Sequence, residues 1–200
     1  EKFKNLEIIL RGYFGIGAER IDKVMNIGSL FRTAHAFGAD FMFTVNSTYS
    51  RREGRRSDTS DSTSHVPFYS FPSVNNMVLP QGCILIGIEL IEDSIDLPSF
   101  RHPQQAAYIL GPERGELSPE IIDQCTHTVK IPTKFCINVG LAGAIVMYDR
   151  MKSLENFARR PITSRGKAES LSEHFYGNPT RRKKMDQYID IPPNDKLNGS

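Results

Sequence analysis

The sequence contains few cysteines and no long apolar run. Its three cysteines, Cys83, Cys125 and Cys136, lie far apart and form no C-x-x-C pair. This spacing argues against a zinc site or a disulfide framework and fits a reducing cytosol. No apolar run is long enough to span a membrane, and the N-terminus lacks a signal-peptide pattern. These absences predict a soluble, cytoplasmic protein.

A strong overall charge is also missing, because 25 Lys and Arg residues nearly balance 23 Asp and Glu residues. The balance is uneven along the chain, since residues 1–149 hold 14 basic and 17 acidic residues, whereas residues 150–200 hold 11 and 6. Basic runs occur at 51–56 (RREGRR), 159–160 and 181–184 (RRKK). Each run alone is typical of a solvated segment, but any of them could contact a polyanion.

Apolar runs alternate with helical patterns up to about residue 158. Strands are expected within 7–17, leading to a glycine-rich turn, and at 41–45, 67–71, 83–90, 106–110 and 127–131. Helices are expected at 27–37, after Ser118 and Pro119, and at 138–157. This alternation is typical of an α/β domain whose mostly parallel sheet has helices on both faces. We predict one domain over residues 1–158 and a loosely ordered basic extension over residues 159–200.

The stretch NIGSLFRTAHAFGAD (26–40) has the pattern of an amphipathic helix. Its apolar face, at about 100° per residue, consists of Ile27, Leu30, Phe31, Ala34 and Phe37. Gly38 stands where a helix commonly ends, and Asn26 is a common N-cap residue. Arg32 points nearly opposite to the apolar face. Periodicity alone therefore predicts a surface arginine and a capping asparagine.

The stretch YILGPERGELSPE (108–120) runs from a strand through a glycine-rich loop into a capped helix. Gly111 and Gly115 would let the backbone approach a ligand closely. Glu113 lies between them, and a simple turn does not require it. Such loops follow the carboxyl ends of parallel strands, where α/β sheets bind ligands.

The stretch IPTKFCINVGLAGAIVMYDR (131–150) leads from a strand end into a long helix. Gly140 and Gly143 each cost a helix roughly 1 kcal/mol relative to alanine, so a closely approaching segment is expected to compensate. In a purely structural interpretation, Asn138 caps this helix and Cys136 is a small buried residue.

In this order and at these separations, the three stretches resemble the signature motifs of the SpoU/TrmH family of RNA ribose 2'-O-methyltransferases, in the SPOUT superfamily. The resemblance covers roughly residues 12–152. It implies a deep C-terminal trefoil knot, an exception to the near absence of knots, and an active homodimer. It also implies S-adenosylmethionine as the cofactor, bound within the knotted loops, and no metal.

The resemblance assigns roles to individual residues. Arg32 matches the catalytic arginine, and Asn26, Glu113 and Asn138 match the polar residues of the three motifs. The positions that would hold the cofactor are Ile88, Gly111, Glu113, Ile131, Cys136 and Leu141. Cys136-Ile137-Asn138 stands where the family commonly has Ser-Leu-Asn or Ser-Met-Asn, and a thiol is a weaker hydrogen-bond partner than a hydroxyl.

The RNA substrate would be a tRNA or an rRNA, with tRNA favoured. Arg51, Arg52, Arg55 and Arg56 are predicted to contact it through phosphates, which gives affinity without sequence information. We expect no further RNA-binding domain before residue 12, so these arginines, the C-terminal extension and the dimer partner are expected to supply recognition.

Three other functions compete with this interpretation. The stretch GYFGIGAER (12–20) suggests an NAD-binding oxidoreductase, although its glycines do not fit G-x-G-x-x-G. A non-catalytic RNA-binding module would share the fold, with Cys136 marking lost activity. A cysteine hydrolase would use Cys136 with His127 or His102, but no pattern in the sequence fixes such a pair.

Overall fold

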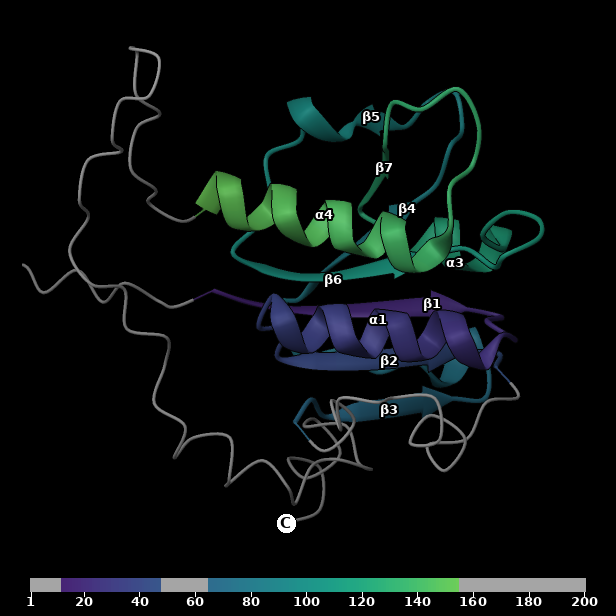
Figure 1. Ribbon diagram of the computed structural model, residues 1–200. Coiled ribbons are helices and arrows are strands. Elements are labelled where there is room, and N and C mark those ends of the chain that lie inside the picture. Colours follow the sequence, from purple (N-terminus) through teal and green to yellow (C-terminus); the bar gives the residue numbers. More distant parts are fainter. Residues whose placement is uncertain (1–11, 48–64, 155–200) are drawn as a thin grey trace, which may run out of the picture.

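The computed structural model describes residues 12–47 and 65–154 (Figure 1). They form a seven-stranded sheet in the order β3-β2-β1-β6-β4-β7-β5. All six strand pairings in this sheet are parallel. The strands are β1 (Tyr13–Glu19), β2 (Phe41–Val45), β3 (Phe68–Phe71), β4 (Ile84–Ile88), β5 (Ile95–Asp96), β6 (Gln105–Leu110) and β7 (His127–Lys130).

Helices cover both faces of the sheet, which confirms the expected α/β architecture. The long helices α1 (Val24–Ala36) and α4 (Val139–Leu154) lie side by side on one face (Figure 1). The short helix α3 (Pro119–Gln124) and the 3-10 turn η2 (Val74–Asn76) pack on the other face. A second 3-10 turn, η3 (Leu97–Ser99), follows β5.

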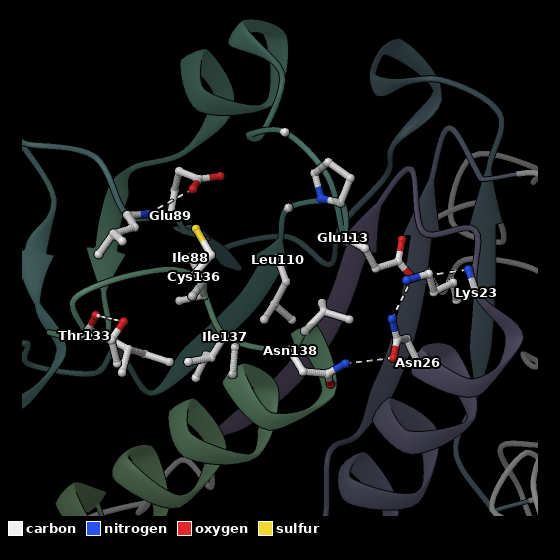
Figure 2. Close-up of a pocket in the computed structure, with 17 residues that line it drawn as sticks. Lys23, Asn26, Ile88, Glu89, Leu110, Glu113, Thr133, Cys136, Ile137 and Asn138 are labelled. Carbon is white, nitrogen blue, oxygen red and sulfur yellow. Dashed lines mark hydrogen bonds between the residues drawn. The ribbon is translucent and has the colours of Figure 1, made fainter.

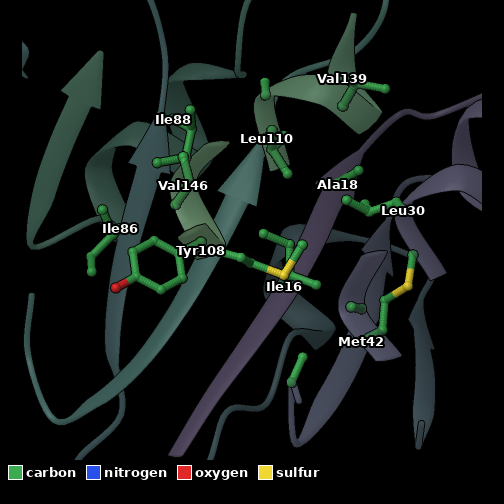
Figure 3. Packing of buried hydrophobic residues seen from close by; sticks show 14 of the residues in the cluster. Ile16, Ala18, Leu30, Met42, Ile86, Ile88, Tyr108, Leu110, Val139 and Val146 are labelled. Atoms are coloured by element: carbon green, nitrogen blue, oxygen red, sulfur yellow. The ribbon is translucent and has the colours of Figure 1, made fainter. Parts of the chain in front are cut away.

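The larger of two apolar clusters lies between the sheet and the two long helices. Ile16, Ile86 and Tyr108 from three strands meet Leu30 of α1 and Val146 of α4 (Figure 3). All five are fully buried. Burying an aliphatic side chain contributes roughly 1.5–3 kcal/mol, so this cluster fixes the helices against the sheet.

The glycine-rich stretch near the N-terminus is a strand, so the turn expected there is wrong. Gly15 and Gly17 lie within β1 and pair with Phe41 and Phe43 of β2. A Cβ atom on Gly15 would lie 2.3 Å from the Phe41 ring, and one on Gly17 would lie 2.6 Å from the Phe43 ring. The two glycines therefore make room for aromatic rings packed across β1.

The close approach expected for the glycines of the last helix is confirmed, and its partner is α1. A Cβ atom on Gly140 would lie 2.8 Å from Ser29 Oγ. One on Gly143 would lie 2.5 Å from Leu30 Cδ1. These contacts let α1 and α4 pack closely along the same face of the sheet.

The ends of the helices differ in part from the expected ones. Helix α1 begins at Val24 with Lys23 as its N-cap, so the prediction that Asn26 caps it is wrong. Gly38, with a φ of +72°, follows the end of α1 as expected. Ser118 caps α3, as predicted, since its hydroxyl oxygen accepts a hydrogen bond of 3.4 Å from the Ile121 N–H.

A buried polar network ties the C-terminal half of α4 to β6. Arg150 Nη1 donates to the Tyr108 hydroxyl oxygen at 3.2 Å, and that hydroxyl lies 2.6 Å from His102 Nδ1. His102 Nε2 lies 3.0 Å from Asp149 Oδ2. Because the carboxylate can only accept, Nε2 carries the proton and Nδ1 accepts from Tyr108. Arg150 also donates to the backbone oxygens of Pro103 and Gln104.

The four arginines at positions 51, 52, 55 and 56 lie outside the described residues, as does the extension from residue 159. Among the helices that the structure describes, none has the length and apolar composition needed to cross a membrane.

Candidate active site

A pocket of about 410 Å³ lies at the carboxyl ends of β4, β6 and β7 (Figure 2). Three segments far apart in the sequence line it: 88–90 from the last residue of β4 onward, 110–115 from the last residue of β6 onward, and 131–139 from the end of β7 to the first residue of α4. Lys23 and Asn26 at the start of α1 complete its rim. The apolar lining residues are Ile88, Leu90, Leu110, Ile131, Ile137, Val139 and Ala142. This is the position where parallel sheets bind ligands.

A chain of side-chain hydrogen bonds joins the three motifs at one side of this pocket (Figure 2). Asn26 Nδ2 donates to Glu113 Oε1 at 2.8 Å. Asn138 Nδ2 donates to Asn26 Oδ1 at 2.9 Å. The structure therefore brings together three of the four residues predicted to act in catalysis, although they are separated by up to 112 positions.

Glu113 is held by donors from the loop that enters α1. Its carboxylate accepts from the backbone N–H groups of Lys23 at 3.2 Å and Asp22 at 3.4 Å, in addition to Asn26. Burial alone would raise the pKa of Glu113, but these hydrogen bonds outweigh burial and lower the pKa below its usual value. Glu113 is therefore an ionised acceptor that orients Asn26.

Asn138 caps α4, as the structural interpretation predicted, and its side-chain amide also reaches Asn26. Its Oδ1 accepts from the backbone N–H groups of Gly140 at 2.9 Å and Leu141 at 3.4 Å. The same side chain thus fixes the start of α4 and one wall of the pocket.

The two loop glycines have separate uses. A Cβ atom on Gly111 would lie 3.0 Å from Glu89 Oε2 and 3.4 Å from the Leu117 backbone nitrogen, so a side chain here would crowd the Glu89 carboxylate. Gly115 has a φ of +97°, which favours glycine. Both glycines line the pocket, as expected for a loop whose backbone lies against a ligand.

Cys136 lines the pocket and is exposed, so it is not the small buried residue of the structural interpretation. Ile88, Gly111 and Ile131, which were predicted to hold the cofactor, line the pocket as well. Leu141 does not. Its side chain is 61% exposed on α4, and only its backbone N–H reaches Asn138.

Arg32 is exposed on α1 and is absent from the residues that line the pocket. It follows Asn26 by six positions, which is about 240° around a helix, so the two side chains leave α1 in different directions. The helical pattern predicted this exposed position. Its role in catalysis stays a prediction.

The sequence did not single out two charged residues of the pocket, Glu89 and Lys23. Glu89 directly follows β4, which ends at Ile88, whereas the strand was expected to continue to residue 90. Had the strand been predicted to end at Ile88, Glu89 would have stood out as an acidic residue just beyond a parallel strand. Lys23 carried no signal, because a lysine before a helix is common on any surface.

The geometry removes two of the competing functions. His102 is buried between Tyr108 and Asp149, and His127 begins β7 at the end away from the pocket, so neither can pair with Cys136. The glycines of residues 12–17 precede or lie in β1 and form no phosphate-binding turn. Within residues 12–47 and 65–154, no group of three or more His, Cys, Asp or Glu side chains is arranged to hold a metal ion.

Comparison with known proteins identifies the family of the chain. Residues 14–148 match the SpoU rRNA Methylase family. The tRNA (guanosine(18)-2'-O)-methyltransferase TARBP1 of Mus musculus is 31% identical over 141 residues, which are 66% of this chain and 9% of that protein. The chain therefore spans about a tenth of the length of this curated relative.

Solved structures share the fold. An rRNA methyltransferase from Sinorhizobium meliloti matches with a TM-score of 0.65 at 19% identity, covering 73% of this chain and 58% of that one. The SpoU methyltransferase AviRb from Streptomyces viridochromogenes, in complex with AdoMet, matches with a TM-score of 0.63 at 23% identity, covering 71% and 58%. The family match covers the first two motif stretches, the third as far as residue 148, and the hydrogen-bonded residues Asn26, Glu113 and Asn138. The chain thus belongs to the SpoU rRNA methylase family, whose cofactor is S-adenosylmethionine.

Proposed function

We propose that this chain methylates a ribose 2'-oxygen in a structured RNA. The observation that carries the proposal is the hydrogen-bonded chain Glu113–Asn26–Asn138 beside an apolar pocket, which joins all three motifs in one place. The name of the mouse relative, which specifies 2'-O-methylation of a tRNA guanosine, supports the ribose oxygen as the acceptor. We favour tRNA over rRNA on the same ground.

The pocket fits the cofactor in size and in lining. Its volume of about 410 Å³ lies within the range of small-molecule sites. Ile88 and Ile131 offer an apolar slot for a purine ring, and Gly111 leaves the loop backbone free of a Cβ atom that would crowd Glu89. When bound, the cofactor supplies a methyl group already activated by a positively charged sulfur.

The protein's own part is to align the ribose oxygen and to stabilise the charge that develops on it. Asn26 and Asn138 would fix the two helix ends that flank the pocket, and Glu113 would hold Asn26 in place. Arg32 would grip a phosphate beside the reacting ribose with its planar, positively charged guanidinium group. It would also stabilise the negative charge that develops on the 2'-oxygen as the hydroxyl proton passes to water.

We propose that the active form is a homodimer. Leu141, Ile145 and Tyr148 follow one another at helical spacing along the outer side of α4, and are 61%, 40% and 50% exposed. Such an apolar stripe is typical of a surface that a partner covers. A second copy would cover it and could carry Arg32 to a pocket that Arg32 does not reach within its own chain.

We also propose that the backbone around this pocket is threaded into the trefoil knot of the superfamily. The support is family membership, together with the convergence of the segments after β4, β6 and β7 on one pocket.

RNA would approach across a rim that carries exposed basic side chains. Lys23 lines the pocket, and Arg114 and Lys134 are exposed on the two loops that enclose it. These charges, with the arginines of residues 51–56 and the basic extension from residue 159, would contact phosphates.

Methyl transfer from labelled cofactor to tRNA and rRNA fractions tests the proposed function. The product should be a nucleoside whose 3' phosphodiester bond resists alkaline hydrolysis, because the blocked 2'-oxygen cannot attack it. Asn138→Ala and Arg32→Ala should abolish transfer, and Arg32→Lys should lose most of it, because lysine lacks the planar fork. Label on a base would contradict the ribose assignment. Binding of cofactor and RNA without transfer would favour a non-catalytic module.

Mixed dimers test whether two chains share one site. A one-to-one mixture of Arg32→Ala and Asn138→Ala chains, each inactive alone, should regain about a quarter of wild-type activity if Arg32 acts across the interface, because half of the dimers are mixed and each mixed dimer has one intact site. The mixture would stay inactive if each chain needed its own Arg32 and Asn138.

A further inference from the structure

Glu89 brings a carboxylate to the wall of the pocket, and neither the motifs nor the proposed mechanism uses it (Figure 2). The residue is half-buried directly after β4. Its Oε2 accepts a hydrogen bond of 2.8 Å from the Leu117 N–H, and its Oε1 accepts one of 2.9 Å from the Leu90 N–H. Two backbone donors on different loops thus hold the carboxylate in one orientation.

The carboxylate keeps accepting capacity for a ligand. A carboxylate offers roughly four lone-pair sites, and the two backbone N–H groups occupy two of them. Along the parts of the chain that the structure describes, no Lys, Arg or His side chain forms an ion pair with Glu89. The remaining lone-pair sites of the carboxylate can therefore accept hydrogen bonds from a ligand in the pocket.

The surroundings of Glu89 indicate what those donors are. Ile88 precedes it and lines the pocket with an apolar side chain, and Gly111 faces it without a side chain of its own. In dinucleotide-binding α/β domains, an acidic residue beyond a parallel strand accepts a hydrogen bond from a ribose hydroxyl, and the apolar slot beside Glu89 offers the same combination.

We propose that Glu89 accepts hydrogen bonds from the 2'- and 3'-hydroxyls of the adenosine part of the cofactor. This inference deepens the proposed function, because it rests on S-adenosylmethionine as the ligand of this pocket. Glu89 is then the residue that selects a ribonucleoside cofactor. Through the Leu117 N–H it also couples the occupied sugar site to the loop that carries Glu113.

Calorimetry with S-adenosylhomocysteine and its 2'-deoxy and 3'-deoxy analogues tests this assignment. The wild-type chain should bind each deoxy analogue about tenfold more weakly, as expected for a lost hydrogen bond to a charged group. Glu89→Gln should bind S-adenosylhomocysteine about tenfold more weakly and should discriminate less than threefold against the deoxy analogues. The ratio between ligands is internal to each variant, so it does not depend on how much of the protein is folded.

Glu92→Gln is the matched control, since Glu92 is an exposed glutamate three residues further along the same loop. It should leave both the affinity and the discrimination of the wild type unchanged. Unchanged discrimination in Glu89→Gln would overturn the assignment, because another group would then contact the hydroxyls. An equal loss for all three ligands with discrimination retained would also overturn it and leave Glu89 as a loop-positioning residue.

A further ligand separates the sugar from the charged end of the cofactor. 5'-Methylthioadenosine keeps the ribose but lacks the amino acid part, so Glu89→Gln should weaken its binding by the same factor as that of S-adenosylhomocysteine. Loss of the effect with this ligand would mean that Glu89 faces the ammonium group instead. If wild-type protein bound none of these ligands, the proposed function itself would fail, which is a distinct result from binding without discrimination.

Discussion

The side-chain amide of Asn138 donates a hydrogen bond of 2.9 Å to the side-chain oxygen of Asn26, 112 positions earlier in the chain. Asn138 also caps α4, and Asn26 lies in the first turn of α1. This single hydrogen bond therefore fixes the position of the start of one long helix relative to the start of the other. Asn26 passes the constraint to Glu113 through its other amide atom. The pocket wall and the packing of α1 against α4 are therefore one structural unit.

Asn26→Asp should weaken cofactor binding strongly, although it changes almost no volume. The side-chain amide that donates to Glu113 would be replaced by a second carboxylate in about the same position. We expect S-adenosylhomocysteine to bind at least about tenfold more weakly at pH 8, since a bond to a charged group is lost. The deficit should shrink towards pH 5.5, because two adjacent carboxyl groups raise the pKa of one and can share a proton.

Asn75→Asp is the control for that experiment, as it places the same change on η2, which packs on the opposite face of the sheet. It should bind the ligand as the wild type does. A pH-independent deficit in Asn26→Asp would show that the loss comes from something other than the contact with Glu113.

Gly143→Ala should destabilise the protein, in spite of the better helix propensity of alanine. Propensity alone would add about 1 kcal/mol to the free energy of unfolding. The new Cβ atom, however, would lie 2.5 Å from Leu30 Cδ1 in a closely packed core, and overpacking costs typically about 1–3 kcal/mol. Urea unfolding should therefore show a net loss.

Leu30→Val tests the cause of that loss, because it shortens the side chain that the new methyl group would meet. Alone it should cost about 1 kcal/mol. Combined with Gly143→Ala, the total loss should be smaller than the sum of the two single losses. Additive losses would mean that the strain of Gly143→Ala arises elsewhere.

Cys136 should react with a thiol reagent well before the other two cysteines. It is exposed at the pocket, whereas burial raises the pKa of the Cys83 thiol to about 11 and that of the Cys125 thiol to about 12. At pH 8 the thiolate fraction of those two would be on the order of one in a thousand or less. Mass spectrometry should find the first label on Cys136, and saturating S-adenosylhomocysteine should slow it.

Cys136→Ser should remove the fast reaction and leave the slow one. Rapid labelling of Cys83 or Cys125 in the native protein would contradict their burial. Labelling of Cys136 at an unchanged rate with bound ligand would place the ligand away from this wall of the pocket.

Much of the fold could be predicted because its signals are local. The strand 41–45 agrees with β2 at both ends, and Ser118 and Pro119 marked the start of α3, since apolar runs and caps act through neighbouring residues. The prediction of a glycine-rich turn was wrong because Gly15 and Gly17 make room for the rings of Phe41 and Phe43 on another strand. No local pattern shows such a contact between distant residues.

The residues of the candidate site also fall into those that the sequence singled out and those that it did not. The resemblance between whole motifs, and not periodicity, singled out Asn26, Glu113 and Asn138, and the structure joins them. Glu89 was missed because the strand was expected to continue to residue 90, and because its partners, the Leu117 N–H and Gly111, come next to it only on folding. Two-residue β5 was missed since so short a strand has no pattern of its own.

His102 should make the stability of the protein fall as the pH is lowered below about 6.5. Burial lowers the pKa of His102 from its usual 6.5, the nearby Asp149 opposes this shift, and Arg150 adds to it. The unfolded chain therefore takes up a proton at this position before the folded chain does. The contribution of His102 is fully present above pH 6.5, and it is lost as the pH falls towards the lower pKa of the folded state.

Urea unfolding between pH 5 and 8 measures how the free energy of unfolding depends on pH. His102→Gln should flatten this dependence, whereas His127→Gln, a change at an exposed histidine, should keep it. A slope that survives in His102→Gln would mean that another group titrates, and that the buried bonds to Tyr108 and Asp149 do not set the acid sensitivity of the fold.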